Sequence, residues 1–188
     1  IAAQHPDKVK EMRQMFVAEA NKYQVFPLDA SVGARVASPR PSLTAGLSEL
    51  VYTRPMTGVP QGDAPYLLNT SYTLTADITV PEGGAEGMIA TSGGRFAGWG
   101  FYLLKGKPVF CWNLLALESI TWEGPQALAP GQHILEFDFR YDGLGVGTMA
   151  FNNFSGIGKS GTGTLKVDGK VVASKTMEKT LPVILQWD

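Results

Sequence analysis

Two segments of the chain alternate strictly between apolar and polar side chains. Apolar residues take every second position of residues 71–80 and, within residues 133–141, of residues 135–141. A β-strand sends successive side chains to opposite faces, so this period of two predicts two strands, each with one buried and one solvated face. The side chains predicted to point inward are Tyr72, Leu74, Ala76, Ile78, Val80, Leu135, Phe137, Phe139 and Tyr141.

Further strands are predicted where short apolar runs are separated by glycine turns. Between residues 82 and 113 the runs are 88–91, 99–104 and 108–112, and the turn residues are Gly83, Gly84, Gly93, Gly94 and Gly106. Lys105-Gly106 and Asp168-Gly169 each separate two strand-like runs, which favours a hairpin at both places. The second hairpin would join 164–168 to 171–174, a last strand would cover 181–187, and 142–163 would form a long loop. Seven or more short strands of this kind predict an antiparallel β-sandwich.

The first part of the chain has a helical rather than a strand pattern. Pro6 suits the first position of a helix, and Asp7 places negative charge at the positive end of the helix dipole. The apolar residues that follow at three- and four-residue spacing are Val9, Met12, Phe16, Ala20 and Tyr23. They predict one amphipathic helix of about four to five turns, which the segment around Pro27 breaks. A single helix cannot bury its own apolar stripe, and we expect the stripe to dock on a part of the protein outside this chain.

Composition excludes partners that bind through strong charge. Sixteen basic and seventeen acidic residues give a formal net charge of −1, so neither nucleic acid nor an anionic membrane is an expected partner. No run of about 18 apolar residues occurs, and we expect a soluble protein. The sequence does not decide whether the protein is cytoplasmic or exported. Because the chain begins at Ile1 without a leader, we expect a fragment of a longer polypeptide.

The candidates for nucleophilic catalysis are few. Cys111 is the only cysteine, and the chain holds two histidines, His5 and His133, to activate it. Free cysteines most often pack inside cores, so the sequence favours a buried strand cysteine. Both histidines are interpreted as exposed turn or cap residues.

Acidic residues suggest two other kinds of site. Glu136 and Asp138 share the outward face of one predicted strand, about 7 Å apart, as a carboxylate pair would. Arg140 shares that face, however, which favours a solvated polar surface. Loop oxygens that could bind calcium belong to Asp63, Asp142 and Asp168. They lack the spacing of a calcium loop, and we expect no metal in this chain.

Aromatic residues offer the remaining candidate site. Trp99, Tyr102, Trp112 and Trp122 could form a platform that stacks on sugar rings, with Arg95 beside it to meet an anionic group. The alternative is that they fill the core, because a sandwich of this size needs large side chains inside. The sequence favours the core, and Arg95, Trp99, Trp112 and Trp122 are kept as weak candidates for ligand binding.

Nearly the whole chain resembles the C-terminal part of a subgroup of bacterial arylsulfatases. The most specific stretches of the resemblance are EGGAEG at 82–87 and GGRFAGWG at 93–100. Others are HPDKVKEM at 5–12, VFPLD at 25–29, RPSL at 40–43, SYTLTAD at 71–77, GKPVF at 106–110 and FDF at 137–139. None of these stretches is a catalytic motif.

The resemblance implies a division of the chain into three parts. Residues 1–29 would be the last helix and tail of a missing catalytic domain, 30–48 a linker, and 49–188 an accessory sandwich of the laminin-G, jelly-roll or concanavalin A-like type. The catalytic domain of such a hydrolase would carry a C/S-x-P-x-R motif, oxidised to formylglycine, and a calcium ion. This chain has neither that motif nor the metal-binding aspartates, so the resemblance implies no cofactor and no catalytic residue here.

Three functions are therefore expected from the sequence. The first is a non-catalytic accessory domain of an arylsulfatase-like sulfuric ester hydrolase, which packs on the catalytic domain or shapes substrate access; this chain alone would not be an enzyme. The second is an autonomous carbohydrate-binding module, in which Trp99, Trp112 or Trp122 stacks on a glycan. The third is self-association through the N-terminal helix.

Overall fold

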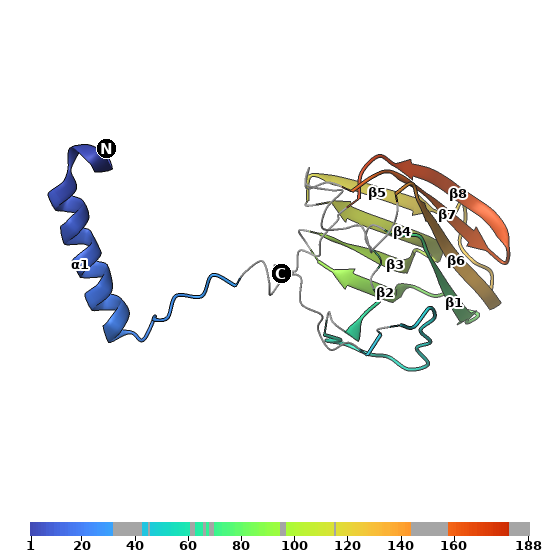
Figure 1. Cartoon of the computed structure of the whole chain (residues 1–188). Coiled ribbons are helices and arrows are strands. Elements are labelled where there is room, and N and C mark those ends of the chain that lie inside the picture. Colours follow the sequence, from blue (N-terminus) through green and yellow to red (C-terminus); the bar gives the residue numbers. More distant parts are fainter. Residues whose placement is uncertain are drawn as a thin grey trace. The chain divides into compact units, whose positions relative to one another are not determined.

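The structure is a computed structural model, and its contacts divide the chain into two compact units, Ile1–Pro65 and Tyr66–Asp188. The residues that it describes are 1–31, 43–44, 46–60, 63–65, 67, 70–94, 97–114, 116–143 and 158–180. The described part of the first unit contains a short 3₁₀-helix, η1 (Ala2–Gln4), and one α-helix, α1 (Pro6–Lys22); the second unit contains the strands (Figure 1). Residues 46–60 form no strand.

Helix α1 begins where the sequence predicts. Pro6 is its first residue, Asp7 lies in its first turn and Lys22 in its last. Of the predicted apolar stripe, Ala20 is buried, at 3% exposure. Phe16 packs edge-on against Phe26, with 5.9 Å between ring centroids. Phe26, just after the helix, therefore contacts the second half of α1.

Helix α1 ends before Pro27, and backbone hydrogen bonds close its last turn. Gln24 adopts the left-handed conformation, with φ 56°. The Val25 amide then donates to the Ala20 carbonyl at 2.8 Å, and the Gln24 amide donates to the Asn21 carbonyl at 3.3 Å. These two bonds form a Schellman motif, which satisfies carbonyls that the last turn would otherwise leave unpaired.

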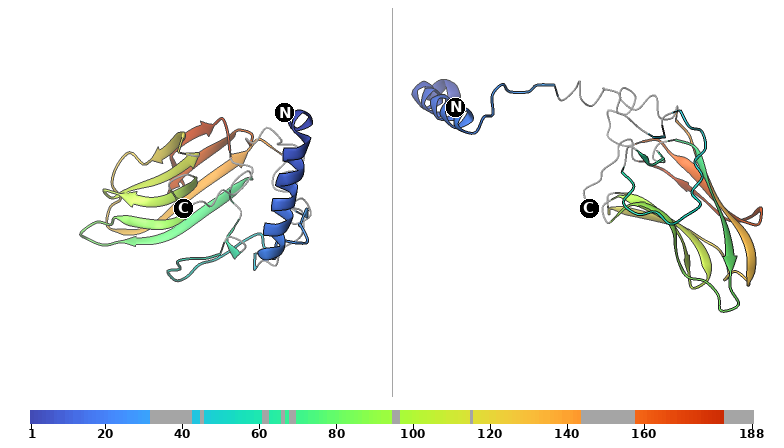
Figure 2. Two further views of the ribbon diagram at one scale, coloured as in Figure 1. Left: turned by 90° about the vertical axis from the view of Figure 1, so that its left-hand side faces the viewer. Right: turned by 90° about the horizontal axis from the view of Figure 1, so that it is seen from below.

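The strands of the second unit form two antiparallel sheets with the orders β1-β6-β7-β8 and β2-β3-β4-β5. The strands are β1 (Tyr72–Val80), β2 (Gly87–Gly93), β3 (Gly98–Leu104), β4 (Lys107–Leu114), β5 (Glu118–Glu123), β6 (Gly131–Tyr141), β7 (Gly161–Val167) and β8 (Lys170–Met177). The meander β2–β5 lies between β1 and β6 in the sequence, while β1 and β6 are neighbours in space, with Tyr72 opposite Phe139. The two sheets lie as two layers (Figure 2). The predicted antiparallel β-sandwich is confirmed.

Aromatic rings from both sheets meet in the core. Phe110 of β4 stacks on Phe137 of β6, with 3.5 Å between ring centroids and 10° between ring planes. Trp122 of β5 meets Phe137 edge-on at 5.0 Å. All three side chains are fully buried. Such contacts add about 0.5–1.5 kcal/mol per pair to the burial of apolar area, so they hold the two sheets together.

Both predicted hairpins are confirmed. Lys105 and Gly106 have φ angles of 51° and 76°, and Asp168 and Gly169 have φ angles of 50° and 76°. Two successive left-handed residues define a type I′ turn, whose twist matches that of the flanking strands. Strand β5 was not predicted as a separate strand. The predicted strand at 181–187 lies outside the described residues.

The prediction of a loop over residues 142–163 is wrong at its end. Strand β7 already begins at Gly161. A Cβ atom at Gly163 would lie 2.6 Å from Phe137 Cζ and 2.7 Å from Trp122 Cζ2, and one at Gly161 would lie 2.3 Å from Phe139 Cζ. Glycine weakens a strand by propensity, but here it leaves the space that the core rings occupy. Residues 144–157 lie outside the described part of the chain.

Candidate functional site

The candidate tryptophans lie inside the sandwich. Trp112 is 2% exposed and Trp122 is fully buried, so neither ring has a surface on which a sugar could stack. Trp99 is half-buried and lies parallel to Phe110, with 5.9 Å between centroids and 16° between planes. These positions agree with the interpretation of the tryptophans as core residues. Arg95 lies outside the described residues.

A depression opens on the face of the β2-β3-β4-β5 sheet that points away from the core. Its volume is about 410 Å³. The polar side chains that line it come from Thr91, Ser92, Tyr102, Cys111, Asn113 and Ser119. Four glycines and Trp99 complete the described lining. We call this feature the outer depression.

Alternation along β3 and β4 places these side chains outward. Phe101 and Phe110 are buried and point into the core. Their neighbours Tyr102 and Cys111 therefore point to the opposite face. The sequence lists Tyr102 among the possible stacking aromatics but does not single it out. Its position between the buried residues Phe101 and Leu103 is the signal that identifies it as the outward aromatic residue.

Glycines allow the backbones of β2 and β3 to approach closely at one end of the outer depression. Gly93 and Gly98 face one another in the β2–β3 pair. A Cβ atom at Gly93 would lie 2.1 Å from the Ala97 carbonyl oxygen, and one at Gly98 would lie 2.2 Å from the Ser92 carbonyl oxygen. Both positions have positive φ angles, 78° and 147°. This end of the hairpin therefore requires glycine at both positions.

Hydrogen bonds fix several of the side chains around the outer depression. The Asn113 amide nitrogen donates to the Gly94 carbonyl at 3.1 Å, and the Asn113 amide oxygen accepts the Ala116 backbone N–H at 3.0 Å. The Thr91 hydroxyl donates to the Trp99 carbonyl at 2.8 Å. These bonds hold polar groups around the depression in fixed positions.

The prediction that Cys111 is buried in the core is wrong, because Cys111 lies on the outward face of β4. Its thiol is half-buried and lies 3.4 Å from the Ser119 hydroxyl. Partial burial, with smaller contributions from Cys111 and Glu123, raises the pKa of the Tyr102 phenol. The outer depression thus presents a thiol, hydroxyls and a neutral phenol.

The prediction that His133 is an exposed turn or cap residue is wrong. It lies inside β6 with a side chain that is 15% exposed. Nδ1 lies 2.8 Å from Asp168 Oδ2, and Nε2 lies 2.8 Å from the Ala129 carbonyl oxygen. Two acceptors flank the ring, so both nitrogens can donate only in the imidazolium form. The bond to Asp168, followed by the bond to Ala129, raises the pKa of His133.

Asp168, the partner of His133, lies in the β7–β8 turn and binds that turn to β6. Its carboxylate also accepts the Ile134 backbone N–H at 2.9 Å, while its own N–H donates to the Ile134 carbonyl at 2.8 Å. The His133 bond, followed by the Ile134 bond, lowers the pKa of Asp168. The pair therefore ties β6 to the hairpin that follows β7. His5, by contrast, is the exposed N-cap residue of α1, as predicted.

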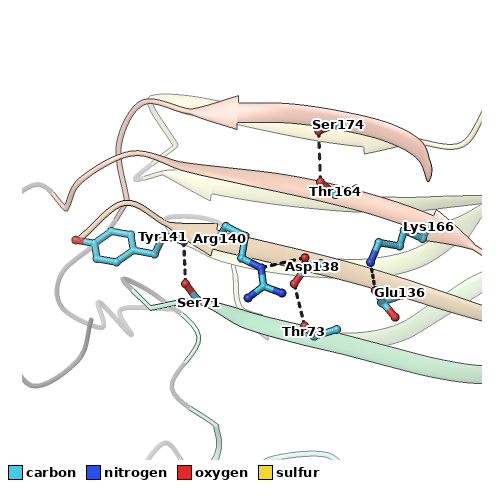
Figure 3. A network of polar contacts seen from close by, with 9 residues as sticks. All are labelled: Ser71, Thr73, Glu136, Asp138, Arg140, Tyr141, Thr164, Lys166 and Ser174. Atoms are coloured by element: carbon cyan, nitrogen blue, oxygen red, sulfur yellow. Dashed lines mark hydrogen bonds and ion pairs between the residues drawn. The ribbon is translucent and has the colours of Figure 1, made fainter. Parts of the chain in front are cut away.

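The outward face of the other sheet carries paired polar side chains (Figure 3). Lys166 Nζ forms an ion pair with Glu136. Asp138 accepts hydrogen bonds from Arg140 Nε at 3.2 Å and from the Thr73 hydroxyl at 2.9 Å. Because Glu136 and Asp138 each have partners of their own, they do not form a carboxylate pair. The face agrees with the solvated surface that the sequence favours.

Among the residues in the described ranges, no group of three or more His, Cys, Asp or Glu side chains is arranged to hold a metal ion. No helix in the same ranges is long and apolar enough to cross a membrane.

Comparison with known proteins adds no relative. No family model, no curated protein and no solved structure matches this chain.

Proposed function

We propose that this chain is the non-catalytic C-terminal accessory region of an arylsulfatase-like sulfuric ester hydrolase, and that α1 docks on the catalytic domain of that hydrolase. The formylglycine and the calcium ion of the reaction belong to that domain. The sandwich, of the concanavalin A-like type, packs beside it or shapes access of the substrate. The observation that carries the proposal is the apolar face of α1, which the described residues of its own unit leave exposed.

Helix α1 has 17 residues, and most of its apolar side chains are exposed. On the predicted apolar stripe, Val9 is 42% exposed, Met12 61% and Phe16 50%. A helix of this length derives most of its stability from packing such a face against a neighbour. Among the ring contacts of the described residues, Phe16 contacts Phe26, which lies in the short tail after the helix. An exposed face of this kind fits a protein partner.

Charged side chains lie beside the apolar face of α1 and suit contact with water. Lys8 pairs with Glu11 at 2.9 Å, and Lys22 lies 3.9 Å from Glu19. All four side chains are more than half exposed. The helix is therefore two-sided, with one face for solvent and one for a partner. The resemblance at residues 5–12 and 25–29 falls on this helix and its tail, which supports a sulfatase catalytic domain as the partner.

The coding sequence immediately upstream of Ile1 tests the parentage. We expect it to be in frame and to encode a C/S-x-P-x-R motif. In a parallel assay, the 188-residue chain should hydrolyse 4-nitrophenyl sulfate no faster than buffer. Hydrolysis above background, or an upstream frame without the motif, would overturn the proposal.

A further inference from the structure

We propose that the outer depression binds one ring of a neutral saccharide, with the Tyr102 side chain as the surface that the ring contacts. The inference stands apart from the docking of α1, because it concerns the sandwich alone. It assigns a ligand class to a surface that neither the resemblance nor the tryptophans identify.

The size of the outer depression suits a single sugar ring. A volume of about 410 Å³ falls within the range of about 300–1,000 Å³ that small-ligand sites occupy. The depression is open to solvent on one side, as a site for one unit of a longer chain must be. Glycines at positions 93, 98 and 100 keep side chains out of this space.

The chemistry of the described lining suits an uncharged ligand with many hydroxyl groups. Thr91, Ser92 and Ser119 carry hydroxyls, and Tyr102 carries a neutral phenol. Each hydroxyl can both donate and accept a hydrogen bond, and so can each hydroxyl of a sugar. The polar side chains in the described lining are all uncharged. The described lining therefore offers hydrogen bonds to a neutral ring.

Tyr102 supplies the apolar contact that such a ligand also needs. Its ring lies beside Gly100, where a Cβ atom would be 3.5 and 3.6 Å from two of the ring carbons. The Met88 methyl group lies on the same patch, 3.7 Å from that Cβ position. Aromatic rings with a polar tip suit surfaces that are partly wet. Tyr102 therefore combines a flat apolar ring with a hydroxyl at the edge of the depression.

Gly100 provides a variant that fills the depression with little disturbance of the fold. Its φ angle is not positive, unlike those of Gly93 and Gly98, and the contacts that a Cβ atom would make are ordinary ones. Gly100→Val adds a β-branched side chain, which strands accommodate well. Gly83→Val is the matched control, because a Cβ atom at Gly83 meets nothing within 4 Å. Tyr102→Ala removes the proposed contact surface.

Titration calorimetry with neutral hexasaccharides tests the inference. The panel is a β-1,3-glucan, a β-1,4-glucan and a β-1,4-galactan, each paired with a sulfated counterpart. We expect at least one neutral saccharide to bind, with affinity reduced about tenfold or more by Gly100→Val and by Tyr102→Ala. Gly83→Val should bind as the unmodified chain does, and all variants should keep the thermal midpoint of the sandwich.

NMR keeps the test independent of the stability of the variants. In the unmodified chain, the same saccharide should shift the Tyr102 ring resonances and leave those of Tyr72 unchanged. Three results would overturn the inference: no binding by any neutral member of the panel, binding of sulfated members only, or binding that neither Gly100→Val nor the NMR map connects with the depression. None of them bears on the docking of α1.

Discussion

The indole Nε1 of Trp122 donates a 2.8 Å hydrogen bond to the backbone carbonyl of Gly163. Trp122 belongs to β5 of one sheet and Gly163 to β7 of the other. The bond satisfies the indole N–H of a fully buried ring, and the missing Cβ of Gly163 leaves room for that ring. One contact thus accounts for a buried polar group, a glycine inside a strand and the position of one sheet on the other.

Adding a methyl group at this contact should destabilise the sandwich. Gly163→Ala places a Cβ atom 2.6 Å from Phe137 Cζ and 2.7 Å from Trp122 Cζ2, so the rings must move. We expect the free energy of unfolding to fall by about 1–3 kcal/mol, as measured by urea denaturation. Gly83→Ala is the control and should change it by less than about 0.5 kcal/mol. Equal stabilities of the two variants would show that the core has space that the contact does not require.

The pair formed by His133 and Asp168 should make the stability of the sandwich depend on pH. The pKa of His133 is raised above its ordinary value of 6.5, so its contribution is fully present below pH 6.5 and is lost as the pH rises through the folded pKa. The pKa of Asp168 is lowered below 3.8, so its contribution is present above pH 3.8 and is lost as the pH falls through the folded pKa. The pair therefore stabilises most between these two values.

Substitutions of either partner should remove this pH dependence. We expect His133→Gln to lower the free energy of unfolding most near pH 5–6 and least near pH 9, as measured by urea denaturation at each pH. Asp168→Asn is the companion variant, because asparagine tolerates the left-handed conformation that position 168 adopts. It should remove the same pH-dependent difference. A cost of His133→Gln that stays constant from pH 5 to pH 9 would contradict the ion pair.

The end of α1 offers a prediction about stabilisation. Gln24 holds the left-handed position of the Schellman motif, with φ 56°, where glycine avoids the strain of a Cβ atom. Gln24→Gly should stabilise the end of the helix by about 0.5–1 kcal/mol, and Gln24→Val should weaken it. Hydrogen exchange of the Val25 amide, which is bonded to the Ala20 carbonyl, measures the effect. Slower exchange in Gln24→Val than in Gln24→Gly would refute this account.

Cys111 provides a direct reporter for the outer depression. It is the only cysteine, so iodoacetamide labels one position, and the thiol lies in the depression beside Ser119. A saccharide bound there should slow the labelling several-fold at saturation, as followed by mass spectrometry. Gly100→Val should abolish this protection, since the saccharide no longer binds. Protection that persists in Gly100→Val would place the saccharide elsewhere.

Local patterns predicted the parts of the fold that depend on local physics. The period of two in 71–80 and 133–141 gives β1 and β6, because alternation alone decides which side is buried. Lys105-Gly106 and Asp168-Gly169 give the hairpins, because few residues adopt positive φ angles. Pro6 gives the start of α1, because proline suits the first position of a helix.

Other features depend on contacts between distant residues, and no local pattern could reveal them. Gly161 and Gly163 have low strand propensity, and only the rings that pack on them explain β7. His133 and Asp168 are 35 residues apart, and the register of β6 on β7 brings them together. The sequence also lists four aromatic residues as one possible platform. The buried neighbours of Tyr102 and the core contacts of Trp112 and Trp122 separate them.

We propose above that the apolar face of α1 docks on a sulfatase catalytic domain, and substitutions on that face test this docking. Val9→Glu/Met12→Glu changes that face at two exposed positions and places a good helix former at both. Leu117→Glu, at a side chain of the sandwich that is 86% exposed, is the matched control. Sedimentation of each chain alone at several concentrations separates docking from self-association, which would appear as a concentration-dependent mass.

The most direct measurement is calorimetric titration of this chain into the separately produced catalytic domain that is encoded upstream. We expect a one-to-one complex that Val9→Glu/Met12→Glu weakens at least tenfold, about 1.4 kcal/mol, while Leu117→Glu leaves it unchanged. The absence of a complex, or a complex that the two helix substitutions do not weaken, would contradict it.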